Sequence, residues 1–303
     1  MILVNSRTSI RLLLIFATLL LIVPRYAHSN KNVDLDEILN ADSRVIEGRR
    51  VALVIGNADY SDGLQLNNPT NDAYRLAGTL SGLGFKLYKS APQTNLRTRV
   101  DFENVISDFI SKIQPSDIVF LYYSGHGVQI EGTNYLVPTQ WRLGLKEQST
   151  QKQRLSKEEI IESLYPMDNF WGLLTDSGAD NLNIVIVDAC RNNPFSGGNQ
   201  TGRAILIDED IEQDANGLAA PGSQPQNTWV SYSTSPGAVA LDGSSNYGAY
   251  TSALVKYLPE PSLDIIETFR RVRAEVVFQT DSSQIPWDSS SVQGKFYFQE
   301  GSL

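Results

Sequence analysis

A single cysteine and one histidine are the residues of this sequence best suited to covalent chemistry. Cys190 is the only cysteine, which excludes an internal disulfide, a paired-thiol redox centre and a thiolate-rich metal site. His126 lies between two glycines, and an imidazole can take a proton from a thiol and later return it to a leaving group. Together, Cys190 and His126 predict a thiol nucleophile with its base. The amides of Gly127 and Cys190 would form an oxyanion hole. The alternative is a structural histidine and an inert buried thiol.

Both residues stand at the end of a stretch with the pattern of a buried strand. Ile184 to Val187 is β-branched throughout, and Asp117 to Gly127 is mostly apolar until it breaks at its glycines. Asn-Asn-Pro at 192–194 must end the first of these strands. That leaves Cys190 at or just past a carboxyl edge, where open α/β sheets place their ligands. We therefore expect His126 and Cys190 at neighbouring strand ends.

The rest of the chain alternates strand and helix patterns. This alternation predicts an α/β fold with a mostly parallel central sheet and helices on both faces. The expected strands are 51–55, 85–88, 117–127, 184–187, 229–234, 238–241 and 294–298, with a hairpin over 128–137, and the expected helices are 70–82, 97–114, 156–164, 250–258 and 263–278.

Helix starts and buried helix faces are predicted at particular residues. Thr70 or Asn71 should cap the first helix, and Ser156-Lys-Glu-Glu159 has the form of a capping box. Val100 and Ile266 fall on the apolar faces of their helices, so we expect both to be buried.

Five segments are expected along the chain. The first 29 residues have a basic start, an apolar run and small residues at the end, which predicts a secretory signal peptide and a secreted or periplasmic protein. That run is shorter than the ~20 residues of a spanning helix, so no stable membrane span is expected after its removal. The segments are 1–29 signal peptide, 30–48 tether, 49–195 with both catalytic residues, 196–228 flexible linker and 229–303 second region.

Charge and composition exclude several classes of function. The chain has 25 basic and 34 acidic residues and a formal net charge of −9, so it has no electrostatic footprint for nucleic acid. One cysteine and two histidines also exclude most transition-metal sites. A phosphatase of the cysteine type would need arginine where Ser196 stands, and no Gly-x-Ser-x-Gly motif of a serine hydrolase occurs.

Two motifs resemble a known family. Tyr123-Ser-Gly-His-Gly127 and Asp188-Ala-Cys190, in that order, are similar to the catalytic motifs of the caspase-like cysteine peptidases. Asp188 stands where caspases have glutamine, and an acid there is the pattern of metacaspases, whose bacterial branch this chain resembles most. Tyr232-Ser-Thr-Ser-Pro-Gly237 resembles the start of the caspase small subunit. The resemblance spans about residues 49 to 298.

The resemblance implies an endopeptidase that cuts proteins or peptides after arginine or lysine. Metacaspases place acids in the pocket for the residue before the cleaved bond, and Asp72, Ser124 and Asp188 match those positions. Two close carboxylates would favour a guanidinium or an ammonium group. Asp72 has the alternative role of a first-turn acid stabilised by the helix dipole, and Asp188 that of a turn cap at a strand end.

Further positions follow from the same resemblance. Ala238, Val239 and Ala240 match the segment that pairs with the substrate backbone, although an ordinary surface strand is an equal alternative. Many metacaspases need calcium, but the acids from Asp208 to Asp214 lack EF-hand spacing, so we expect no cofactor and leave calcium as the alternative. The rival function is a catalytically silent, caspase-like module that binds partner proteins.

Overall fold

The computed structural model describes residues 44–61, 63–144, 156–176, 181–190, 218, 224–235 and 246–301, with the main chain alone at 143, 144 and 190. Its central sheet contains β1 (Arg50–Gly56), β2 (Lys86–Leu87), β4 (Ile118–Ile130), β7 (Leu182–Cys190), β8 (Thr228–Tyr232) and β9 (Trp287–Ser290). The strand order is β2-β1-β4-β7-β8-β9, and only the pair of β8 with β9 is antiparallel. The predicted mostly parallel sheet is confirmed.

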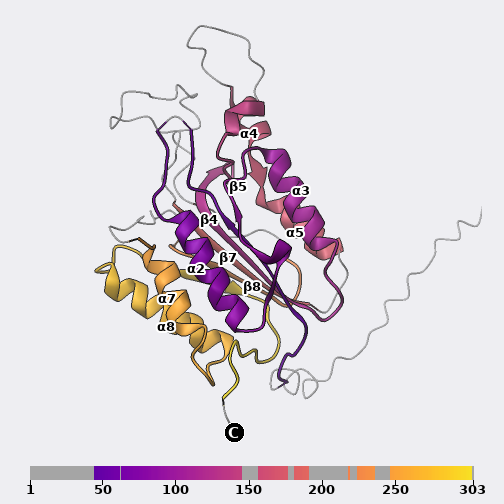
Figure 1. The fold of residues 1–303 in the computed structure, drawn as a ribbon, viewed down its shortest axis with the longest axis vertical. Helices are drawn as coiled ribbons and strands as arrows, with labels where there is room; N and C mark the ends of the chain where they lie inside the picture. Colours follow the sequence, from indigo (N-terminus) through magenta and orange to yellow (C-terminus); the bar gives the residue numbers. More distant parts are fainter. Residues whose placement is uncertain are drawn as a thin grey trace, which may run out of the picture.

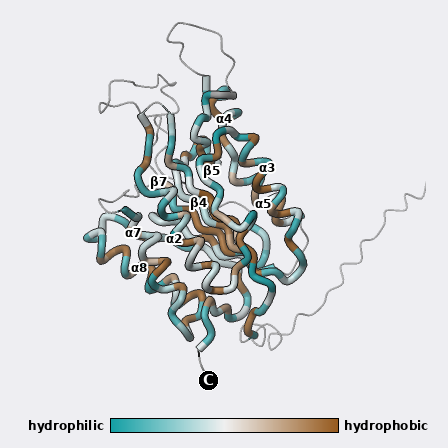
Figure 2. The backbone as a smooth tube through the Cα atoms, viewed as in Figure 1, coloured by the Kyte–Doolittle hydropathy of each residue, from teal (hydrophilic) through white to brown (hydrophobic). Residues whose placement is uncertain are grey.

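Helices cover both faces of this sheet (Figure 1). One face carries α2 (Pro69–Gly82), α7 (Ala249–Tyr257) and α8 (Ile265–Gln279), and the other carries α3 (Arg99–Ile110) and α5 (Met167–Asp176). Because side chains alternate along a strand, Leu121 packs with α3 and α5 whereas Phe120 packs with α2 and α8. The central strands are therefore hydrophobic along their buried middle part, as Figure 2 shows.

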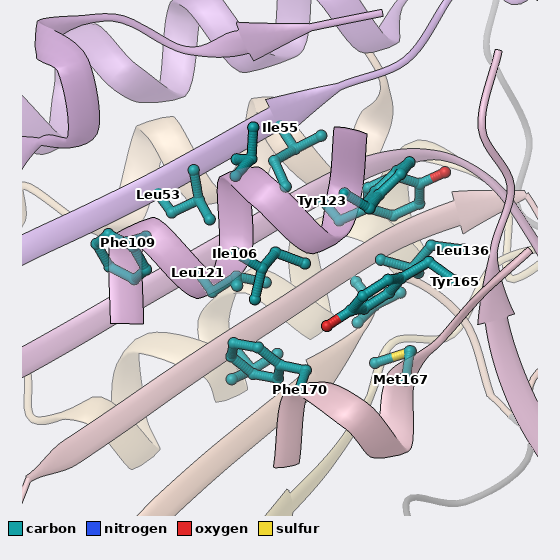
Figure 3. Close-up of a cluster of buried hydrophobic side chains, with 14 of the residues drawn as sticks. Leu53, Ile55, Ile106, Phe109, Leu121, Tyr123, Leu136, Tyr165, Met167 and Phe170 are labelled. Carbon is teal, nitrogen blue, oxygen red and sulfur yellow. The ribbon is translucent and has the colours of Figure 1, made fainter. Parts of the chain in front are cut away.

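The core on the α3 side is built from four elements that come from different parts of the sequence. Figure 3 shows Leu53 and Ile55 of β1 beside Leu121 of β4, with Ile106 of α3 and Phe170 of α5 closing the cluster. All five side chains are at least 96% buried. This packing holds β1 and β4 rigidly, and so it positions the residues at their carboxyl ends.

β4 does not stop at its glycines, which corrects the expected break there. It continues through Gly127 to Ile130 because it changes partner from β7 to the antiparallel strand β5 (Thr133–Leu136). Glu131 and Gly132 form the turn with positive φ angles, as the predicted hairpin requires. The remaining short elements are β3 (Gln93–Thr94), which pairs with β1, β6 (Tyr165–Pro166), which pairs with β5, the 3₁₀ turns η1 (Tyr88–Ser90) and η2 (Trp141–Gly144), and α4 (Lys157–Ser163).

Two strand predictions need correction. The expected strand 85–88 contains only Lys86 and Leu87 before η1 begins. The stretch 294–298 makes only isolated bridges, and the last strand of the sheet is β9 instead. The alternating aromatic pattern of 294–298 comes from Phe296 and Phe298, whose rings are buried in the core although the stretch forms no strand ladder.

The helix predictions hold in outline but differ in detail. Ser156 makes the expected capping box with Glu159. At α2 the N-cap is Asn68, whose side chain makes no cap hydrogen bond to the helix, so the cap predicted at Thr70 or Asn71 is wrong. Pro69 explains the shift, because proline favours the first helical position. Val100 and Ile266 are 57% and 64% exposed, so the buried faces of α3 and α8 are narrower than expected. No pattern in the sequence predicted α5 or β6.

Candidate active site

The imidazole of His126 is held by a main-chain oxygen of the loop after β1. Its Nε2 lies 2.8 Å from the carbonyl oxygen of Leu64, and the residue is only 7% exposed. A carbonyl oxygen can only accept a hydrogen bond, so Nε2 carries the proton of the neutral ring. The lone pair is then on Nδ1, and this is the nitrogen that can act as a base.

Two buried tyrosines hold the main chain of His126. The backbone N–H of His126 donates to the hydroxyl of Tyr60 at 2.8 Å, and the hydroxyl of Tyr123 donates to the carbonyl oxygen of His126 at 2.6 Å. The rings of Tyr60 and His126 also meet edge to face, with centroids 4.4 Å apart. His126 is thus held through its N–H, its carbonyl oxygen and its ring.

The glycines beside His126 are required by space. A β carbon on Gly125 would lie 2.6 Å from the hydroxyl oxygens of both Tyr60 and Tyr123. A β carbon on Gly127 would lie 3.0 Å from the β carbon of Ala189. A side chain at position 125 would therefore displace the two hydroxyls that hold His126, and one at position 127 would press on Ala189 of the neighbouring strand.

The backbone N–H of Gly127 does not donate a hydrogen bond to β5. The backbone N–H of Val137 donates to the carbonyl oxygen of His126 at 3.1 Å, which makes these two residues a hydrogen-bonded pair. Such pairs alternate along an antiparallel ladder, so Gly127 and Leu136 form a non-hydrogen-bonded pair. The N–H of Gly127 therefore points away from β5.

Cys190 is the last residue of β7 and the register partner of His126 on β4. Neighbouring strands lie about 4.8 Å apart, so the main chains of the two predicted catalytic residues are adjacent at the carboxyl end of the sheet. The same register pairs Ser124 with Asp188, two residues earlier on each strand.

The three residues predicted for the specificity pocket come from three elements. Asp72 lies in the first turn of α2 and is 2% exposed, and Ser124 on β4 is 3% exposed. The backbone N–H of Gly248 donates to the carboxylate of Asp72, at 3.0 Å from Oδ1 and 3.3 Å from Oδ2. A β carbon on Gly248 would lie 3.1 Å from Asp72 Oδ2 and 3.8 Å from Asp188 Oδ2. The two carboxylates therefore flank one point in front of Gly248.

Two buried hydroxyls contact the second of these carboxylates. Thr251 Oγ1 donates to Asp188 Oδ2 at 2.9 Å, and the hydroxyl of Tyr122 lies 2.6 Å from Thr251 Oγ1 and 3.3 Å from Asp188 Oδ2. Burial, and then the negative charges of Asp188 and Asp72, raise the pKa of Tyr122 well above 10. Tyr122 thus stays protonated, and its hydroxyl is a donor in the group that it forms with Thr251 and Asp188.

Sequence reasoning missed several residues of this site. Leu64 takes part through its carbonyl oxygen, for which no residue type is a signal. Tyr60, Gly248 and Thr251 reach the site only through tertiary packing. Leu218, inside the predicted linker, is 1% exposed, and its Cδ2 lies 3.3 Å from where a β carbon of Gly127 would be.

Other predicted features lie outside the described residues. They are the signal peptide 1–29, the acidic cluster Asp208–Asp214 and the substrate-pairing residues Ala238, Val239 and Ala240. Within the described ranges, no three His, Cys, Asp or Glu residues gather as a metal site would require. No helix of those ranges has the length and apolar character to cross a bilayer.

Comparisons with known proteins identify the family of this chain. The caspase domain matches residues 49–297. The human mucosa-associated lymphoid tissue lymphoma translocation protein 1 is 31% identical over 109 residues, and its mouse homolog is 32% identical over 91 residues. These matches cover 36% and 29% of this chain but only 12% and 10% of the relatives' own lengths.

A solved structure shows the same fold. The crystal structure of caspase-1 from Spodoptera frugiperda matches with a TM-score of 0.54 and 15% identity, over 86% of this chain and 95% of that chain. The predicted resemblance to the caspase-like cysteine peptidases is thereby confirmed, and the chain belongs to the caspase domain family.

Proposed function

We propose that this chain is a cysteine endopeptidase of the metacaspase-like branch, which hydrolyses peptide bonds after arginine or lysine. The observation that carries the proposal is the placement of two carboxylates, Asp72 and Asp188, around one point at the sheet end where His126 and Cys190 are register partners. Family membership supports a peptidase. The side-chain chemistry of the site supports the basic preference.

The reaction would pass through a covalent intermediate. Nδ1 of His126 takes the thiol proton of Cys190, and the thiolate attacks the carbonyl carbon of the substrate. The amides of Gly127 and Cys190 stabilise the oxyanion that forms. His126 then gives the proton to the leaving amine, which breaks the peptide bond and leaves an acyl-enzyme. A water molecule, deprotonated by His126, hydrolyses this thioester and restores the thiol.

The specificity would follow from charge. An arginine or lysine side chain can donate hydrogen bonds to Asp72 and Asp188, whereas an aspartate side chain would be repelled by both. Ser124, the register partner of Asp188, would add a hydroxyl to the wall of the pocket. Ala238, Val239 and Ala240 remain predicted to pair with the substrate backbone.

The segment organisation belongs to the same proposal. The region 49–195 supplies His126 and Cys190, the linker 196–228 follows, and the region 229–303 supplies α7 beside the pocket. With the predicted signal peptide removed, the enzyme would act on proteins or peptides in a secreted or periplasmic location.

A chloromethylketone that carries arginine tests this proposal on the purified protein. The thiolate of a working site displaces chloride from the reagent and forms a thioether, which peptide mass spectrometry locates. We expect rapid labelling of Cys190 in the wild type, strongly reduced labelling in His126→Ala, and slow labelling by the matched aspartyl reagent. Equal labelling by both reagents would refute the basic pocket. A folded protein that neither reagent labels would favour the silent binding module.

A further inference from the structure

The backbone conformation of Gly248 does not require glycine, so the reason for a glycine here is the space around it. Its φ of −64° and ψ of 149° are open to any residue. It is the N-cap of α7, a position that favours Ser, Thr, Asp, Asn and Gly. Neither the backbone angles nor the cap position therefore requires glycine here.

The space that Gly248 leaves open is the space between the two carboxylates. A β carbon would sit 3.1 Å from Asp72 Oδ2 and 3.8 Å from Asp188 Oδ2. A methyl group at that point would narrow the gap between the two carboxylates, which a cation held by both acids must enter. The backbone N–H of Gly248 meanwhile donates to Asp72 and fixes the carboxylate on one side of the gap.

Thr251, one turn further along α7, fixes the carboxylate on the other side. Its side chain is fully buried. An ionised Asp188 can only accept, and Thr251 Oγ1 donates to its Oδ2 at 2.9 Å, a shorter contact than the 3.3 Å from the hydroxyl of Tyr122. The oxygen of Thr251 is then the acceptor for Tyr122 at 2.6 Å. The hydrogen bonds thus run in one direction, from Tyr122 through Thr251 to Asp188.

We propose that the first turn of α7 determines the preference for a basic residue: Gly248 keeps the gap open for the cation, and Thr251 holds Asp188 in place to receive it. This inference rests on the proposed function, and it names two residues that the catalytic motifs do not contain. Gly248 is a specificity-determining residue and Thr251 a positioning residue, since neither is required to touch the reacting bond.

Two matched peptide substrates test the inference. They carry arginine or citrulline before the cleaved bond, which have almost the same shape but differ in charge. The ratio of their kcat/KM values measures recognition of the cation. We expect Gly248→Ala to lose most of this ratio, because its methyl group occupies the gap. We expect Thr251→Val to lower the ratio about tenfold or more, as for a lost hydrogen bond to a charged group.

Three variants serve as controls. Thr251→Ser keeps the hydroxyl and should keep the ratio. Gly78→Ala lies on α2, the helix of Asp72, where a β carbon would meet nothing within 4 Å, so the ratio should not change. Thr268→Val removes a buried hydroxyl on α8 and should also leave the ratio unchanged. The rate of Cys190 alkylation by iodoacetamide, which has no basic group, should be the same in every variant.

The possible results separate this inference from the proposed function. A wild-type enzyme that does not distinguish arginine from citrulline refutes the basic pocket itself. A wild-type enzyme that distinguishes them, together with Gly248→Ala and Thr251→Val variants that do so equally well, refutes only the role of α7. If Gly248→Ala does not fold, the comparison of Thr251→Val with Thr251→Ser decides alone.

Discussion

The Nε2 atom of His126 lies 2.8 Å from the carbonyl oxygen of Leu64. This contact joins the second half of β4 to the loop that follows β1, so the orientation of the only histidine in the described chain depends on main chain 62 residues away. It also fixes which ring nitrogen carries the proton. The basic nitrogen of the proposed dyad is therefore Nδ1.

The tautomer of His126 can be observed directly. In protein labelled with ¹⁵N, long-range ¹H–¹⁵N correlations distinguish a protonated Nε2 from a protonated Nδ1. We expect the Nε2–H form in the neutral ring, because the carbonyl oxygen of Leu64 can only accept. A neutral ring with its proton on Nδ1 would show that this contact does not orient the base.

Tyr60→Phe should destabilise the site without removing a proposed catalytic group. The substitution leaves the buried N–H of His126 without its acceptor. An unsatisfied buried donor costs about 1–3 kcal/mol, which urea unfolding would measure as a lower free energy of unfolding. We also expect lower kcat/KM, because the peptide unit of His126 can shift. Tyr74→Phe, at an exposed position, should change neither quantity. A Tyr60→Phe enzyme with wild-type stability and activity would contradict this role.

The raised pKa of Tyr122 predicts a loss of stability at alkaline pH. Its hydroxyl keeps its proton in the folded state above pH 10, where an unfolded tyrosine loses it. The stabilisation is therefore fully present below pH 10 and declines as the pH rises further, by about 1.4 kcal/mol per pH unit for one tyrosine. Urea unfolding at a series of alkaline pH values should show a shallower decline in Tyr122→Phe than in the wild type. Parallel declines would mean that Tyr122 ionises normally in the folded protein.

Leu218 should contribute to stability far more than its position in the predicted linker suggests. It is 1% exposed and packs in the core on the α3 side of the sheet. Leu218→Ala should lower the free energy of unfolding by about 2–5 kcal/mol. Val100→Ala, at a position 57% exposed, should change it by less than about 0.5 kcal/mol. If the two variants are equally stable, Leu218 is not a core residue in solution.

The parallel sheet and the strand ends that carry His126 and Cys190 could be predicted from local patterns. A buried strand is indicated by the β-branched run before Cys190 and another by the apolar run before His126. The register of these two strands pairs His126 with Cys190, as expected for motifs at neighbouring strand ends. The capping box at Ser156 is equally local, because Ser156 and Glu159 satisfy each other within one helical turn.

Most of what surrounds these residues could not be predicted locally. Thr251 reaches Asp188 across 63 residues, and Gly248 reaches Asp72 across 176 residues, so neither contact leaves a pattern in a short window. The strand predicted at 294–298 was wrong because alternating aromatic residues indicate burial, here of Phe296 and Phe298. The same alternation occurs in a loop that packs on the core.

The most direct measurement is a comparison of kcat/KM for peptide amides that differ only in the residue before the cleaved bond. With Asp72 and Asp188 flanking the pocket, arginine and lysine substrates should be cleaved at least about a hundredfold faster than the aspartate substrate. Cys190→Ala should abolish cleavage of all of them. An enzyme that cleaves after aspartate as well as after arginine, or one whose activity survives the loss of Cys190, would contradict the proposed function.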